Sequence, residues 1–215
     1  MNKLLNQSIE IKKVLPATLI VFSGLAILLF FSSYIAIFSL AVTSYIAFII
    51  VYSHQNTKAL FSKPVNPVRN IFFYFVLNWV VSMSVALTLN NVFGWHLRGN
   101  AVNDKPGLAL LIILPIMIMG EELFSMYFLS VFSSKFKLWI ASCLSAVVFG
   151  LIHFTTYYNG DIFKTLIHIL LIQGSARLIF NRAAIKSNSI WTSWIIHLLF
   201  DFSSILVVLI TQLIK

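Results

Sequence analysis

Seven apolar stretches of about membrane-spanning length follow one another along this chain of 215 residues. A helix of about 20 apolar residues crosses the roughly 30 Å of hydrocarbon in a bilayer. With 60% hydrophobic residues, 10% charged residues and a mean hydropathy of +0.94, the chain cannot be a soluble domain. We predict an all-α, polytopic transmembrane helical bundle of about seven helices, within a range of six to eight. The predicted spans are 14–31, 34–52, 68–89, 107–132, 138–157, 162–180 and 190–213.

Basic residues are concentrated on one side of the predicted bundle. Of the 15 Lys and Arg residues, this side holds Lys3, Lys12, Lys13, Lys58, Lys63, Arg69, Lys135, Lys137, Arg177, Arg182 and Lys186. Because cytoplasmic loops retain basic residues during insertion, the N-terminus is predicted to be cytoplasmic and the C-terminus external, in what we expect to be a bacterial cell membrane. This bias and the anionic inner leaflet account for the net charge of +9, so we expect the lipid bilayer, and no nucleic acid, as a partner.

Two adjacent carboxylates, Glu121 and Glu122, interrupt the fourth predicted span. An acidic side chain in mid-membrane costs about 2.5 to 3.5 kcal/mol, so such a pair needs partners, protons or a function. Later spans supply His153, His197 and Asp201, and a helical rise of about 1.5 Å per residue places all of them within the hydrocarbon layer. His197 and Asp201 are four residues apart and share a helix face. Glu121 and Glu122 point about 100° apart and cannot share one task equally.

Three motifs on successive spans resemble a known family. They are Glu121-Glu122-Leu123-Phe124-Ser125-Met126, Phe149-Gly150-Leu151-Ile152-His153 and His197-Leu198-Leu199-Phe200-Asp201. The CAAX protease and bacteriocin-processing family, also called the ABI family, carries E-E-x-x-x-R, F-x-x-x-H and H-x-x-x-N in this order, with Asp sometimes replacing the Asn. Because the chain has no internal repeat and no low-complexity segment, we predict a single integral membrane domain, residues 1–215. The resemblance implies a CAAX-protease-like catalytic core at 107–203.

One position departs from the family pattern. Met126 stands where the family carries Arg, and that Arg would fix a motif carboxylate through a charge-assisted pair. Arg177 is a candidate substitute, although its expected position near the cytoplasmic end of the sixth span argues against it. The departure weakens the prediction of an enzyme.

The resemblance implies roles for five residues in intramembrane peptide hydrolysis. Glu121 and His153 would activate water, since a carboxylate in apolar surroundings is a stronger base than one in water. His197 and Asp201 would stabilise the oxyanion, where a preorganised donor is worth about 2.7 to 4 kcal/mol. Alternatively, an ionised Asp201 would orient His197. Glu122 completes the set of candidate catalytic residues.

A metal centre is the second chemical interpretation of these residues. Glu121, His153 and His197 would suffice as zinc ligands, with Asp201 in reserve. The helical zinc signature H-E-x-x-H does not occur in the sequence. We therefore favour hydrolysis that requires no cofactor and keep zinc as an alternative.

The leading hypothesis is an endopeptidase that acts on a peptide or membrane-protein substrate, in bacteriocin self-immunity or in the processing of secreted peptides. The alternative is a non-catalytic immunity or regulatory protein that binds a toxin, receptor or enzyme, and Met126 favours it. A transporter is disfavoured because the sequence shows no internal repeat. The sequence does not predict an oligomeric state.

Overall fold

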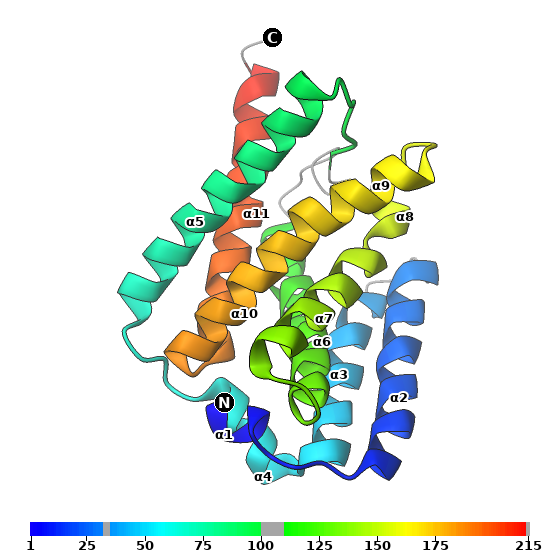
Figure 1. The fold of residues 1–215 in the computed structure, drawn as a ribbon, viewed down its shortest axis with the longest axis vertical. Helices are drawn as coiled ribbons and strands as arrows, with labels where there is room; N and C mark the ends of the chain where they lie inside the picture. The colour runs from blue at the N-terminus through cyan, green and yellow to red at the C-terminus, as the bar shows by residue number, and fades with distance from the viewer. Residues whose placement is uncertain (32–34, 100–109, 214–215) are drawn as a thin grey trace.

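The computed structural model describes residues 1–31, 35–99 and 110–213, and its regular structure in these ranges is helical (Figure 1). The apolar segments form α2 (Ile11–Phe30), α3 (Ala36–Tyr52), α5 (Pro67–Leu87), α6 (Leu110–Ser133), α7 (Leu138–Ile152), α9 (Ile162–Ile169), α10 (Ser175–Ser187) and α11 (Ile190–Leu213). The short helices are α1 (Asn2–Leu5), α4 (His54–Thr57), η1 (Lys58–Phe61) and α8 (Phe154–Tyr157). A π-helical turn, η2 (Thr88–Val92), extends α5, and a second one, η4 (Leu170–Gly174), joins α9 to α10.

The predicted all-α membrane bundle is confirmed. Among the described residues, five helices are long and apolar enough to cross a membrane, while α3 and α7 are shorter apolar helices. Each of the seven predicted spans coincides with one of these segments, and α9 and α10 together form the sixth. The predicted starts of two spans, at residue 34 and at 107–109, lie outside the described residues.

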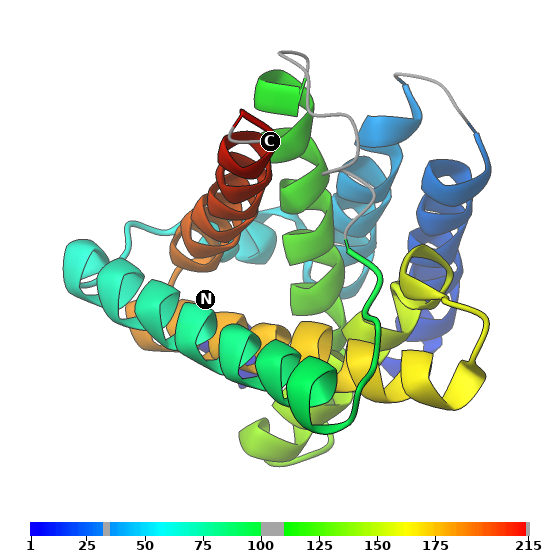
Figure 2. The ribbon, with the colours of Figure 1, turned by 90° about the horizontal axis from the view of Figure 1, so that it is seen from above.

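Helix α6 is the centre of the bundle. Helices α2 and α3 lie on one side of it, whereas α11 lies on the other (Figure 2). Helices α5 and α10 pack against each other and against α11. The core between α3 and α6 contains Phe48, Phe124, Met126 and Tyr127, all fully buried. The rings of Phe48 and Tyr127 meet edge to face, with centroids 5.8 Å apart. This packing fixes the helix that carries the Glu121–Glu122 pair.

Helices α2 and α3 approach closely at Gly24. A Cβ at this position would collide with Thr43 Oγ1 and lie 2.9 Å from the Ser39 carbonyl oxygen. We expect Gly24→Val to lower the stability of the protein by about 1 to 3 kcal/mol, because overpacking forces backbone shifts. Thermal unfolding in detergent measures this, with Ser23→Val at the exposed neighbouring position as the control. Equal unfolding temperatures for the two variants would contradict the close contact.

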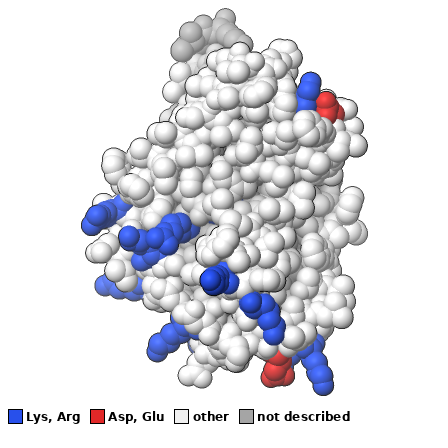
Figure 3. Space-filling model, in the orientation of Figure 1, with Lys and Arg blue, Asp and Glu red and all other residues white. Residues whose placement is uncertain are grey.

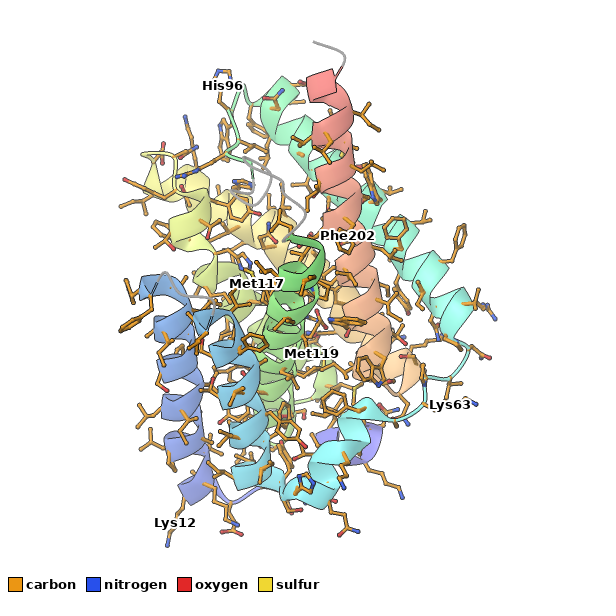
Figure 4. All side chains as sticks on the ribbon, turned by 180° about the vertical axis from the view of Figure 1, so that it is seen from behind. Lys12, Lys63, His96, Met117, Met119 and Phe202 are labelled. Carbon is orange, nitrogen blue, oxygen red and sulfur yellow. The ribbon has the colours of Figure 1, made fainter. Side chains whose placement is uncertain are left out.

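The basic side chains gather at one end of the molecule. On the face in Figure 3, most Lys and Arg atoms lie in the lower half, where the N-terminus lies in Figure 1. Lys12 and Lys63 lie at the end opposite to His96 (Figure 4). The charge asymmetry is therefore a property of the fold, and the cytoplasmic position of this basic end stays a prediction. Arg177 is an exception, because its side chain is fully buried inside the bundle.

Candidate active site

A break in the helix positions His153. The predicted span 138–157 is not one continuous helix, since α7 ends at Ile152 and α8 starts at Phe154, with His153 at φ −88° and ψ 0° between them. Nδ1 of His153 lies 2.8 Å from the Phe149 carbonyl oxygen. A carbonyl oxygen only accepts, so Nδ1 carries the proton and donates it. Nε2 of His153 faces Glu121, 3.8 Å from Oε2.

His197, on α11, is anchored in a similar way. Its Nδ1 lies 3.0 Å from Oε1 of Glu122, a carboxylate that accepts a hydrogen bond from the ring. Its Nε2 is 3.8 Å from Oε2 of Glu121 and 4.0 Å from Oδ2 of Asp201. Nε2 of His197, like Nε2 of His153, therefore faces Glu121. Glu122, and not Asp201, makes the hydrogen bond that orients His197.

Glu122 is paired with an arginine from another helix. Nη1 and Nη2 of Arg177, on α10, donate to Oε1 and Oε2 of Glu122 at 2.7 and 3.1 Å, and both side chains have no exposed surface. Nε of Arg177 donates to Oδ1 of Asn181 at 3.0 Å, and Asn181 in turn contacts Ser142 Oγ at 3.1 Å. A bidentate pair held by a further hydrogen bond is a rigid support for the carboxylate.

Arg177 makes the charge-assisted pair with a motif carboxylate that the family pattern would assign to an arginine at the position of Met126. Met126 lies four residues after Glu122 on α6 and is fully buried in the apolar core. The predicted sixth span ended at residue 180, which placed Arg177 near the membrane surface. The helix instead continues to Ser187, so Arg177 lies about 15 Å from its end, at the depth of the Glu pair.

The two glutamates are divided between separate environments, as their angular separation on α6 suggested. Glu122 is completely buried against Arg177, whereas the Glu121 side chain is 20% exposed. Glu121 lines a cavity of about 380 Å³ together with His153, His197 and Asp201. The four candidate residues that face the cavity thus lie around one space, and Glu122 lies behind His197.

His168 is a cavity residue that the sequence did not single out. It belongs to none of the three motifs. It lines the same cavity, with its ring 5.0 Å from that of Tyr157. Its buried Nδ1 has no hydrogen-bond partner among the residues that the structure describes. Only its place in a span, as an unexplained intramembrane histidine, gave a signal.

The candidate zinc ligands Glu121, His153 and His197 face one another without direct hydrogen bonds. Within the described ranges, no group of three or more His, Cys, Asp or Glu side chains is arranged to hold a metal ion. The two Nε2 atoms lie 3.8 Å from the same Glu121 oxygen, too long for a direct hydrogen bond and suited to one bridging water.

These features define a class of protein: a polytopic membrane protein with carboxylate and imidazole groups around an intramembrane cavity. Residues 103–203 match the family model described as type II CAAX prenyl endopeptidase Rce1-like. The match includes all three motifs and agrees with the family resemblance, so this part of the chain is similar to a family of CAAX-type intramembrane proteases. A search of curated proteins and a search of solved structures each found no match.

Proposed function

We propose that this protein is a glutamate-dependent intramembrane endopeptidase that hydrolyses a peptide bond near the membrane. The observation that carries the proposal is the approach of two imidazole Nε2 atoms to one carboxylate oxygen, each at 3.8 Å, inside a cavity. Both imidazoles are oriented by hydrogen bonds at Nδ1, which leaves their Nε2 atoms for chemistry.

In the proposed reaction, Glu121 is the general base. A water between Glu121 and His153 gives its proton to the carboxylate and attacks the scissile carbonyl carbon. The C–N bond then breaks, and the proton passes to the leaving amine. His197 stabilises the oxyanion by donating from Nε2, and this role requires a proton on Nε2 in addition to the one that Nδ1 donates to Glu122.

The proposed mechanism uses no metal ion, and metal removal tests this. We expect the activity of purified protein to survive EDTA and 1,10-phenanthroline, because the carboxylate itself activates the water. Inhibition by both chelators that added zinc reverses would contradict the metal-free mechanism. It would make Glu121, His153 and His197 the zinc ligands instead.

The non-catalytic alternative rested on Met126. Arg177 supplies a guanidinium to the motif carboxylate Glu122 from another helix. The absence of an arginine at position 126 therefore no longer favours a protein without catalytic activity. We propose that the substrate is a bacteriocin or another secreted peptide, as for the small bacterial proteins that this chain resembles. Binding without cleavage remains the outcome that the experiment must separate from hydrolysis.

A comparison of peptide termini in cells tests the proposal without a known substrate. Cells express the wild type, His153→Ala or His197→Ala at matched membrane levels, and new termini of exported and membrane proteins are identified by mass spectrometry. We expect termini that occur only with the wild type. Identical termini in all three strains would contradict hydrolysis and favour a protein that binds without cleavage.

A further inference from the structure

The cavity that contains Glu121 opens toward one end of the bundle. At that end it is lined by Leu97, Arg98 and Gly99, from the segment after α5, and Arg98 and Gly99 are exposed. His96, the neighbour of this segment, lies at the end of the molecule opposite to Lys12 and Lys63 (Figure 4). The mouth of the cavity is therefore remote from the basic end.

Most of the residues that line the cavity lie on the parts of the helices that are remote from the basic end. Helix α5 starts at the basic end with Pro67, and its lining residues Ser82 and Ala86 lie about 22 to 29 Å further along the helix. Helix α11 also rises from the basic end, and its lining residues extend from His197 to Ser204. Tyr157 adds to the wall beyond the upper end of α7.

Buried side chains close the cavity toward the basic end. The Glu122–Arg177 pair and Asn181 have no exposed surface, and Phe180, which reaches the cavity floor, is 1% exposed. Because solvent does not reach these side chains, the cavity has no opening past them. The same arginine that orients Glu122 therefore also separates the site from the basic end.

From this asymmetry we propose that the site takes its substrate from the external side of the membrane. The step from the structure to the membrane rests on the concentration of Lys and Arg at the closed end, which the positive-inside rule places in the cytoplasm. The substrate class is an exported peptide that reaches the site from outside, and a peptide confined to the cytoplasm is excluded. The inference deepens the proposed function and rests on it for the statement that the bound peptide is cleaved.

Cysteine labelling from each side of the membrane tests the direction of opening. In a Cys143→Ser background, which removes the single native cysteine, Ala86→Cys and Ser204→Cys place thiols in the cavity wall. A membrane-impermeant charged maleimide is added to intact cells and to permeabilised cells. Thiols react as thiolates in water, so a lipid-embedded thiol is a poor target.

Two control variants show how thiols at the basic end and at a lipid-facing surface react with the maleimide. Lys135→Cys reports the basic end, and Val80→Cys on α5, at a position 57% exposed outside the cavity, reports a surface facing lipid. We expect Ala86→Cys and Ser204→Cys to react in intact cells, Lys135→Cys to react only after permeabilisation, and Val80→Cys to remain unlabelled. The same pattern is expected in a Glu121→Gln background, because access does not require catalysis.

The outcomes separate this inference from the proposed function. Labelling of the cavity thiols only after permeabilisation, or no labelling at all, would overturn external loading, as would reaction of Lys135→Cys in intact cells. Labelling needs no activity, so the expected pattern together with unchanged peptide termini in the His153→Ala strain would refute the protease and leave the external opening intact.

Discussion

Glu121→Gln is expected to lower the rate of peptide hydrolysis by about 10² to 10⁴-fold, the range for loss of a general base. The amide keeps the shape of the side chain but cannot accept the proton of the attacking water. It also retains a polar group facing Nε2 of His153 and of His197, so the fold should persist. The measurement is the rate of cleavage by purified protein in liposomes, with unfolding temperatures recorded in parallel.

Glu10→Gln is the matched control for this prediction. Glu10 is an exposed carboxylate that pairs with Lys13 across the start of α2, at 2.7 Å. Exposed ion pairs contribute about 0 to 1 kcal/mol, so neither activity nor stability should change appreciably. If Glu121→Gln retained the activity of Glu10→Gln, Glu121 would not be the base, and the geometric argument for the site would fail.

Arg177→Met is expected to destabilise the protein by about 3 to 5 kcal/mol and to abolish activity. The substitution leaves the Glu122 carboxylate without its bidentate partner. Because both side chains have no exposed surface, water cannot replace the guanidinium. The substitution also removes the support of the carboxylate that accepts the hydrogen bond from Nδ1 of His197. Thermal unfolding in detergent and peptide cleavage in liposomes measure the two effects.

A double variant separates stability from activity at this pair. Glu122→Gln combined with Arg177→Met removes both charges, and we expect it to recover most of the lost stability, since the unpaired carboxylate is the main cost. Activity should not return, because His197 has lost its carboxylate. Recovery of activity would show that the pair serves packing alone.

Moving the arginine back to the family position gives a further check. Met126 lies one helical turn from Glu122 on α6, so Met126→Arg in the Arg177→Met background presents a guanidinium to the same carboxylate. We expect partial recovery of activity. No recovery, in a variant that folds, would contradict the substitution of Arg177 for the motif arginine.

The sequence was sufficient for the fold class and for the set of candidate residues. Long apolar stretches dictate helices in a bilayer, and costly acidic residues in such stretches point to a site. Depth along the helices indicated that Glu121, His153, His197 and Asp201 were able to meet, and the structure places them around one cavity. The angular separation of adjacent residues on a helix likewise indicated different tasks for Glu121 and Glu122.

Other features required the three-dimensional structure. The depth of Arg177 depended on where the sixth helix ended, and hydropathy marks the end of apolar residues, not of the helix. The break at His153 follows from a backbone conformation that apolar residues on either side do not reveal. His168 belongs to no motif, and its place in the cavity wall follows from the packing of α9 against α8, where its ring meets that of Tyr157.

Hydrolysis by the purified protein tests the central claim most directly. Wild type and Glu121→Gln are reconstituted in liposomes with a mixture of quenched fluorescent peptides, in water enriched in heavy oxygen, and the products are analysed by mass spectrometry. The account predicts that the wild type releases fragments whose new carboxyl groups contain heavy oxygen, and that Glu121→Gln does not. Folded wild type that cleaves no peptide, or equal cleavage by both proteins, would contradict it.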